Sequence, residues 1–340
     1  MKDILKNRKL LIVAEIGVNH NGSLKLAKKM ISAAKKSGAD AVKIQTFNTS
    51  QVMKKNSPLA KFQKKNVGNK DFFDVAKSLE LNKKNHIDLI NYCNKKKIIF
   101  FSTPCDLESA KLLKKLKIKI FKTASADIDH FFLHDYLSTL NEPVIISTGM
   151  SKIKDIENVL KIYKKRKKKN IYLLHCISSY PTKHEDVNLN ILDTLKKYNY
   201  GVGFSDHTSD YMSSCIAVAK GARIIEKHFT INKNLKGLDH KVSNNEKEFS
   251  LMVKKIRETQ KIIGNKNKNI FDCEKNMYEI SKKSIHLSKN LNKNDIIKKD
   301  DLDFIRPGNG ISAMDLKKVI KKRLKKNLNK GFKLNTSVLK

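Results

Sequence analysis

The chain lacks tryptophan, and its five cysteines are scattered without a CxxC pair. This spacing argues against a disulfide framework and a cysteine-based zinc site, and it suits a reducing compartment. Long apolar runs are also missing, so no segment is predicted to cross a membrane. Residues 1–9 have no apolar stretch of the kind found in a signal peptide. We therefore expect a cytoplasmic protein with no membrane partner.

Arginine and acidic residues are scarce beside lysine. Lys and Arg total 71 against 33 Asp and Glu, a net charge of +38, and the arginines are Arg8, Arg166, Arg223, Arg257, Arg306 and Arg323. One interpretation is nucleic-acid binding, because clustered cations neutralise phosphates. The lysines are instead spread over expected helix faces and loops, which favours a compositional bias, and we expect no specific nucleic-acid partner. A positive field would still draw anionic substrates into a cleft.

Apolar, β-rich runs alternate eight times with helical periodicity. This pattern predicts an α/β fold, a TIM (β/α)8 barrel in residues 1–264, and no GxGxxG follows the first strand to support a doubly wound sheet. The strands are expected at residues 10–14, 41–45, 98–102, 118–122, 143–147, 171–175, 200–204 and 222–227. The helices are expected at residues 24–37, 83–95, 107–115, 131–140, 152–165, 189–198, 210–220 and 246–263.

Two further segments depart from the barrel pattern. Residues 48–81 form an insertion longer than a normal connection, and we expect it to fold as a lid or an extra helix. A polar, Asn- and Lys-rich stretch predicts a linker over residues 265–282, followed by a small domain over residues 283–340. This domain should contain short strands, an RPGNG turn and one helix near residues 313–320. At about 60 residues it would be marginal alone.

Two histidines stand where consecutive strands of the expected barrel end. His207 follows GFSD, and His228 follows the apolar run that ends in EK. The carboxyl ends of barrel strands share one rim, so both imidazoles should face the same opening. Imidazole suits a divalent cation that keeps open positions for substrate oxygens. The alternative is that each histidine caps a strand or satisfies a core hydrogen bond, and spacing alone does not decide between the two.

Other polar side chains follow the neighbouring strands. Lys43 and Lys122 lie in apolar strands, and the hydroxyl groups nearby belong to Thr103, Ser125, Ser147 and Ser205. Ammonium groups bind anions as point charges and hydroxyls fix orientation, so this set can hold a phosphorylated carboxylate. The alternatives are surface lysines and hydroxyls that only cap strand ends. Gly22 and Gly149 are expected simply to permit tight turns.

Eight motifs occur in order along the chain: AEIGVNHNGS, KIQTF, FSTP, STGM, GFSDHT, EKHFT, GLDHKVS and RPGNGIS. In these motifs the chain resembles the sialic acid synthase family. The resemblance spans nearly the whole chain, and residues 283–340 resemble the family's antifreeze-like (SAF, β-clip) domain. It implies a TIM barrel and a divalent metal such as Mn²⁺, with Mg²⁺ or Co²⁺ as alternatives. It also implies a domain-swapped homodimer whose C-terminal domain covers the partner's barrel mouth. Members condense phosphoenolpyruvate with an N-acetylated mannose-type sugar.

The resemblance implies a role for each matching residue. His207 and His228 would bind the metal. The residues that would hold phosphoenolpyruvate are Lys43, Thr103, Lys122, Ser125, Ser147 and Ser205. The residues that would face the sugar or assist proton transfer are Glu15, Gln45, Asp127, Tyr180 and Asp239. Glu15 would position or deprotonate the water that attacks the substrate, and Tyr180 and Asp239 are the other catalytic candidates.

Four positions concern the acceptor sugar. Arg306 would contact its N-acetyl group from the partner subunit, unless it only stabilises its turn. Ser178, a substrate-contact position, stands where many members carry Asn or Thr. Lys183 and Leu238 stand where members carry proline. These departures leave the sugar open.

The first expectation for the acceptor is N-acetylmannosamine, which would make the chain an N-acetylneuraminate synthase, because RPGNGIS and EDVNLN resemble bacterial enzymes of that type. The alternative is a 2,4-diacetamido-2,4,6-trideoxymannose, which would give N,N'-diacetyllegionaminate. Three interpretations belong to other classes. They are a Schiff-base aldolase through Lys122, a nucleic-acid binder and a non-catalytic scaffold.

Overall fold

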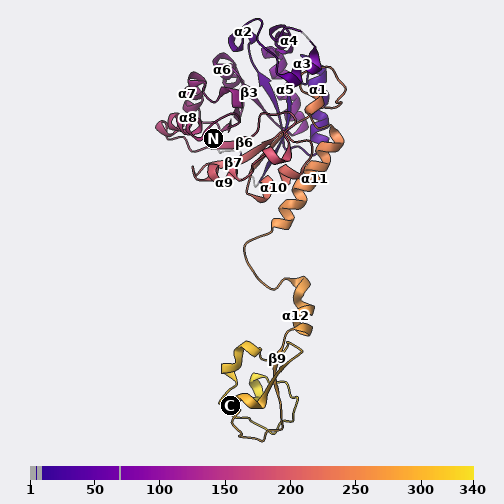
Figure 1. Ribbon diagram of the computed structural model, residues 1–340, viewed down its shortest axis with the longest axis vertical. Helices are drawn as coiled ribbons and strands as arrows, with labels where there is room; N and C mark the ends of the chain where they lie inside the picture. Colours follow the sequence, from indigo (N-terminus) through magenta and orange to yellow (C-terminus); the bar gives the residue numbers. More distant parts are fainter. Residues whose placement is uncertain (1–4, 6–9, 69) are drawn as a thin grey trace. The chain divides into compact units, whose positions relative to one another are not determined.

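The computed structural model describes residue 5, residues 10–68 and residues 70–340. The described residues form two compact units, one ending at Gly264 and the other beginning at Asn265 (Figure 1). The expectation for residues 1–9 lies, apart from Leu5, outside this part of the chain. Among the described residues, no helix is both long enough and apolar enough to cross a bilayer.

In the described residues, the first unit is a closed barrel of parallel strands in the order β1 to β8. The strands are β1 (Leu11–Gly17), β2 (Ala41–Thr46), β3 (Ile99–Pro104), β4 (Phe121–Thr123), β5 (Val144–Ser147), β6 (Ile171–Cys176), β7 (Gly201–Asp206) and β8 (Ile224–His228). The predicted TIM barrel is confirmed. Strands covered on both faces are apolar throughout, which is why the sequence pattern reveals them.

The fourth strand is shorter and later than predicted. Residues 118–122 were expected, but pairing begins at Phe121. The backbone N–H of Ile118 bonds the Leu113 carbonyl, and Lys117 has a left-handed φ of 59°, so Ile118 still belongs to the end of the preceding helix. Residues of this kind close a helix rather than start a strand.

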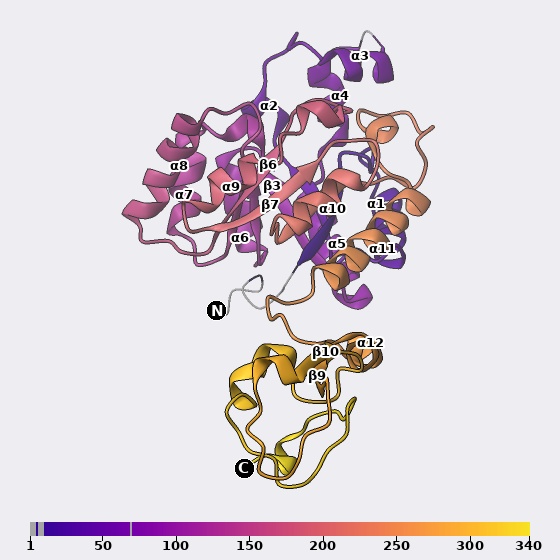
Figure 2. The same ribbon diagram turned by 60° about the horizontal axis from the view of Figure 1, so that its bottom comes forward.

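The barrel helices lie outside the strands (Figure 2). They are α1 (Leu24–Lys36), α5 (Lys83–Lys96), α6 (Leu107–Lys115), α7 (Phe131–Thr139), α8 (Ile153–Lys165), α9 (Ile191–Lys196), α10 (Met212–Ala219) and α11 (Glu246–Ile263). Side-chain caps start several of them: Ser23 accepts from Leu26 N–H, and Asn245 forms a capping box with Glu248.

Residues 48–68 and 70–81 of the insertion form the short helices α2 (Thr49–Val52), α3 (Lys61–Val67) and α4 (Phe72–Leu79), as expected for added helical structure. They gather at one end of the barrel (Figures 1 and 2). Leu79 joins Val18 and Leu238 in a small apolar cluster separate from the main core. This cluster attaches the insertion to the loops that follow β1 and β8.

The second unit has its own apolar core, which includes Ile285, Leu287, Leu324 and Leu334. Its antiparallel pair is β9 (Ser284–Leu287) with β10 (Leu302–Ile305). Where an irregular linker was expected, the chain forms α12 (Lys275–Ser281), which has no buried residue. The helix expected near residues 313–320 is a kinked 3-10 segment, Ala313–Lys318, because Asp315 leaves helical geometry.

Candidate active site

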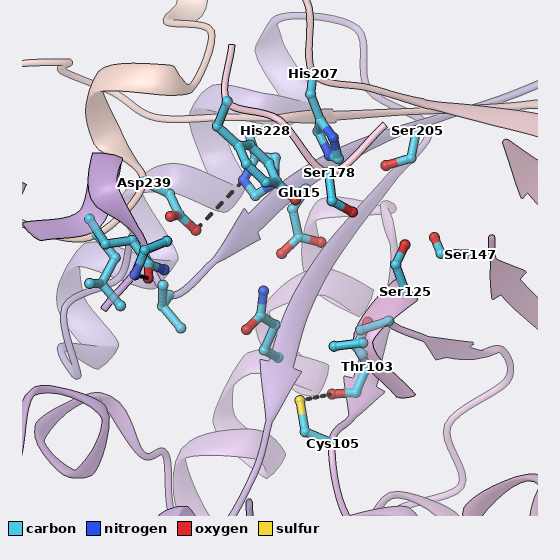
Figure 3. A pocket seen from close by; sticks show the side chains of 18 of the residues that line it. Glu15, Thr103, Cys105, Ser125, Ser147, Ser178, Ser205, His207, His228 and Asp239 are labelled. Carbon is cyan, nitrogen blue, oxygen red and sulfur yellow. Dashed lines mark hydrogen bonds and ion pairs between the residues drawn. The ribbon is translucent and has the colours of Figure 1, made fainter. Parts of the chain in front are cut away.

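A cavity of about 790 Å³ lies at the carboxyl ends of the barrel strands. Its wall contains most of the residues singled out from the sequence, namely Glu15, Lys43, Gln45, Thr103, Lys122, Ser125, Ser147, Ser178, Tyr180, Ser205, His207, His228 and Asp239. Figure 3 shows Ser125, Ser147 and Ser205 along one side and Asp239 across from them. The volume is that of a small-molecule site. The fold therefore brings these residues together, and their individual roles stay predictions.

Two of the predicted residues are not among those that line the cavity. Asp127 belongs to the 3-10 turn Ser125–Asp127 and is absent from the cavity wall. Its backbone carbonyl accepts a hydrogen bond from buried His134, and burial raises the pKa of its carboxyl to about 7. Arg306 belongs to the second unit, where its side chain is exposed.

Two lysines and two carboxylates form a buried charge centre at the bottom of the cavity. Lys43 forms an ion pair with Glu15, and its Nζ lies 3.8 Å from Glu226 Oε1. Lys122 Nζ lies 3.6 Å from the same oxygen and donates to Ser147 Oγ at 2.5 Å. The four charged residues are at most 5% exposed. Both ammonium groups thus converge on one anionic oxygen, the arrangement that a bound anion needs.

Burial shifts the protonation of this centre. It raises the pKa of Glu15, although Lys43 opposes the shift. Burial acts in the same direction on Glu226, but Lys122 and Lys43 outweigh it and hold the pKa of that carboxyl below its usual range. Burial also lowers the pKa of Lys122. The centre therefore holds one firmly ionised carboxylate, Glu226, and one, Glu15, that takes up a proton more readily.

The sequence analysis assigns no role to Glu226, which lies two residues before His228. Its position could have been predicted, because residues two apart on a strand point to the same face, so Glu226 faces the same side as His228. In the structure Ser205 Oγ donates to Glu226 Oε1 at 3.0 Å, from the strand position paired with it. Ser205 thereby fixes the carboxylate against both lysines.

The two imidazoles lie beside the charge centre, with ring centroids 5.5 Å apart. His207 Nδ1 donates to the Ile177 carbonyl at 2.6 Å, which leaves Nε2 as its free acceptor nitrogen. His228 Nδ1 is buried and has no hydrogen-bond partner within the described chain, and it lies 3.9 Å from Asp239 Oδ2 (Figure 3). Burial lowers the pKa of both rings, that of His228 to about 3. Both imidazoles are neutral at neutral pH.

This pair suits a divalent cation by its donor chemistry. Neutral imidazole is a ligand for such ions, and the backbone hydrogen bond of His207 orients its ring in the manner of metal-binding histidines. In the described residues no group of three or more His, Cys, Asp or Glu side chains forms a complete ligand set. A cation held here would take its other ligands from substrate or water, as the sequence analysis anticipated.

Tyr180 connects the imidazoles to the insertion. Its ring lies 4.2 Å from the His207 ring and 5.0 Å from the ring of Phe62 in α3, measured between centroids. Burial raises the pKa of its phenol, so Tyr180 stays protonated at neutral pH and can donate a hydrogen bond. Phe62 was not singled out from the sequence, because the path of the insertion has no signature there.

Gly149 lies in a turn after β5, as expected, and it also leaves room for two hydroxyl groups. A Cβ at this position would lie 2.7 Å from both Ser125 Oγ and Ser178 Oγ. Its backbone N–H donates to Ser125 Oγ at 3.1 Å. The missing side chain therefore allows these two hydroxyls to approach the backbone at the cavity wall. Lys183, one of the departures noted in the sequence, is exposed and pairs with Glu185.

Comparison with known proteins gives the same family as the motifs. The NeuB family matches residues 30–268, and the SAF domain matches residues 282–331. N,N'-diacetyllegionaminic acid synthase of Campylobacter jejuni is 41% identical, with 94% of this chain and 97% of that protein covered. The Legionella pneumophila protein of the same name is 37% identical, with 95% and 92% covered.

A solved structure supports the same assignment. The N-acetylneuraminic acid synthetase of Leptospira borgpetersenii, in complex with citrate, is 34% identical, has a TM-score of 0.69, and is matched over 79% of this chain and 90% of that one. The resemblance predicted from the motifs is thus confirmed. The chain belongs to the NeuB family, whose similar members are named as sialic and legionaminic acid synthases.

Proposed function

We propose that this protein condenses phosphoenolpyruvate with the open-chain form of an N-acetylated mannose-type sugar. The methylene carbon of phosphoenolpyruvate bonds to the sugar aldehyde carbon, water adds at C2, and the C2–O bond to phosphate then breaks. The products are a nine-carbon 2-keto sugar acid and phosphate. The observation that carries the proposal is the buried pair Lys43 and Lys122, which converge on one anionic oxygen beside two neutral imidazoles.

Phosphoenolpyruvate has a carboxylate and a phosphate, which match the two ammonium groups. Lys43 Nζ donates to Thr103 Oγ1 at 3.1 Å and Lys122 Nζ donates to Ser147 Oγ, so the lysine positions are already set. Preorganised cations in a buried site stabilise developing anionic charge without reorganising during the reaction. The net charge of +38 favours the approach of such an anionic substrate.

The proposed metal residues are His207 and His228, with Mn²⁺ as the first choice and Mg²⁺ or Co²⁺ as alternatives. When bound there, a divalent cation supplies Lewis-acid polarisation of the sugar aldehyde oxygen. The donor set fits this role because both rings are neutral and His207 has a fixed tautomer. The imidazoles orient the aldehyde against the phosphoenolpyruvate held by the lysines.

Three further side chains would transfer protons or form hydrogen bonds during the reaction. Glu15 is our candidate for deprotonating the attacking water, because burial raises its pKa toward the range in which a carboxylate is an effective base. Tyr180, with its retained proton, would donate to the sugar alkoxide as it forms. Asp239, whose pKa burial raises to about 6, would accept a hydrogen bond from a hydroxyl group of the sugar. Its Oδ2 lies 3.9 Å from His228 Nδ1.

For the acceptor we propose the 2,4-diacetamido-2,4,6-trideoxymannose, in place of the N-acetylmannosamine that the sequence motifs put first. The two legionaminic acid synthases reported above support this choice. So does the apolar wall of the cavity, formed by Phe62, Phe72, Leu79 and Leu238. Contact with such a wall stabilises a bound C6 methyl group by removing it from water. A C6 hydroxyl group would lose its hydrogen bonds to water there.

Three more features belong to the proposal. We propose that the protein forms a homodimer in which Arg306 of one subunit contacts the N-acetyl group held by the other, as the family resemblance implies. We place the reaction in the cytoplasm, in agreement with five unpaired cysteines, all in the described part of the chain. The exposed turn that carries Arg306 is free of the small domain's core, which suits a contact with a ligand.

The test measures phosphate release from phosphoenolpyruvate with each of the two sugars, with Mn²⁺ or with EDTA. We expect release only with sugar and metal together, and a higher kcat/KM for the diacetamido sugar. A higher kcat/KM for N-acetylmannosamine would reverse the acceptor assignment. No phosphate release under any of these conditions, together with borohydride trapping of Lys122 in the presence of a 2-keto sugar acid that EDTA does not prevent, would replace the proposal with a Schiff-base aldolase.

A further inference from the structure

A second buried ion pair lies directly behind the imidazoles, and the proposed reaction does not use it. Asp206 and Lys227 are paired across β7 and β8, and Lys227 Nζ lies 3.1 Å from Asp206 Oδ2. Only 1% and 2% of their surfaces are exposed. His228, the next residue after Lys227, lines the cavity. Since successive strand residues point to opposite faces, the pair lies on the helix side of the barrel wall.

The same pair holds the loop after β7. Lys227 Nζ donates to the carbonyl oxygens of Thr208 at 2.6 Å and Asp210 at 2.9 Å. Asp206 Oδ1 accepts from the backbone N–H of Thr208 at 2.8 Å and from its hydroxyl at 2.7 Å. Asp206 Oδ2 accepts from Ser214 Oγ of α10 at 2.6 Å. The loop is therefore bonded to both strands and to the helix that follows it.

Stability alone is a poor explanation for this arrangement. Removing two charges from water is costly, and replacing a buried ion pair by apolar groups of the same shape often leaves stability unchanged. The distinctive effect of the pair is geometric. His207 follows Asp206 and His228 follows Lys227, so the pair joins the two backbone segments that carry the imidazoles. Ligand distances in metal sites vary by only about 0.2 Å, so small shifts of these segments matter.

We propose that Asp206 and Lys227 are positioning residues that set the separation and orientation of the two imidazoles, and through them the affinity for the divalent cation. The inference rests on the proposed metal role of His207 and His228. Neither Asp206 nor Lys227 touches the cation. Their effect passes through the loop carbonyls and the paired strand ends, as that of groups behind metal ligands generally does.

The experiment compares Mn²⁺ binding by the metal-free, full-length wild type and the double variant Asp206→Asn/Lys227→Met. Free Mn²⁺ is followed by electron paramagnetic resonance during titration, so the readout needs no turnover. The double variant removes both charges at once and keeps the side-chain shapes, which avoids an unpaired buried ion. We expect its Kd for Mn²⁺ to rise about 10–100-fold. The single variant Lys227→Arg keeps the positive charge and several hydrogen-bond donors, so it should retain most of the wild-type affinity for Mn²⁺.

Lys168→Met is the matched control. Lys168 is also a buried lysine that donates to two carbonyls of one loop, those of Leu140 and Glu142. That loop precedes β5, at the end of the barrel away from the cavity. The control variant should lose thermal stability and bind Mn²⁺ as the wild type does.

The outcomes separate the inference from the function it rests on. A wild type that binds no Mn²⁺ overturns the metal site and the inference together. A wild type that binds Mn²⁺, with an equal Kd for the double variant, overturns the inference and leaves the metal site standing. A Kd raised as much in Lys168→Met as in the double variant also overturns it, because the effect would then be a general loss of stability.

Discussion

Lys43→Met tests the buried charge centre most directly. In the wild type the Glu15 carboxylate is 1% exposed and forms an ion pair with Lys43. The variant leaves that carboxylate buried without its cation and leaves Glu226 with Lys122 at 3.6 Å. Breaking a buried pair from one side costs about 3–5 kcal/mol. In a unit of this size that corresponds to a melting temperature lower by roughly 6–20 °C.

The pH dependence identifies the cause. Burial raises the pKa of Glu15 in the folded protein, and loss of Lys43 raises it further, so the carboxyl contributes full stability only below its unfolded pKa. Stability is then lost as the pH rises toward the folded pKa. Because the pKa of Glu15 is about 7 in the wild type, the deficit of Lys43→Met relative to wild type should shrink by up to about 1.4 kcal/mol per pH unit of acidification between pH 8.5 and 7, and change little below pH 7.

Differential scanning calorimetry of the full-length protein measures both effects. The control is Glu15→Gln/Lys43→Met, which removes both charges. It should unfold at a higher temperature than Lys43→Met at pH 8.5 and should lack the loss of stability with rising pH that Glu15 causes. Phosphoenolpyruvate should raise the melting temperature of the wild type and not that of either variant. The reasoning fails if Lys43→Met has the same deficit at pH 8.5 and at pH 7, or if the double variant is no more stable than the single one at pH 8.5.

Three other predictions follow from the site and the fold. His207→Ala and His228→Ala should each abolish metal-dependent phosphate release while the melting temperature of the metal-free protein changes little; turnover retained in either variant would remove the metal site. Arg306→Ala should raise KM for the sugar more than KM for phosphoenolpyruvate, and mixing it with His207→Ala should recover activity in hybrid dimers; no recovery argues against a shared site. His134 forms hydrogen bonds with Tyr163 and with the Asp127 carbonyl, and burial lowers its pKa to about 4. In the folded protein it therefore takes up a proton at a lower pH than in the unfolded chain. His134 should contribute about 3 kcal/mol to the fall in the free energy of unfolding between pH 6.5 and 4, and urea titrations of His134→Gln should show a fall smaller by that amount.

The barrel could be predicted from the sequence because its strands are covered on both faces. Each strand is a short apolar run, and the helices between them have separate amphipathic patterns, so local periodicity contains the information. The strand-end position of Lys43 and His228 also follows from local pattern, since the chemistry of this fold lies at one rim. The late start of β4 at Phe121 could not be predicted, because the first residue of this strand depends on the backbone hydrogen bonds that end α6.

The missed parts of the site depend on register between distant segments. Glu226 meets Lys43 across a barrel that closes between the first and last strands, and nothing local indicates that distance. Tyr180 meets Phe62 only because the insertion folds back over the strand ends. The ion pair of Asp206 with Lys227 likewise requires the register of β7 and β8.

The cavity has two walls of different origin, and this affects how such an enzyme diversifies. The reaction groups come from strands whose positions the whole barrel determines, so a substitution there disturbs many neighbours. The apolar wall comes mainly from the insertion that carries the short helices α2 to α4, with Leu238 added from the loop after β8. Exchanging the segment over residues 48–81 between relatives is therefore a route to new acceptors that leaves the bond-forming machinery in place. Natural selection and protein engineering have the same access to it.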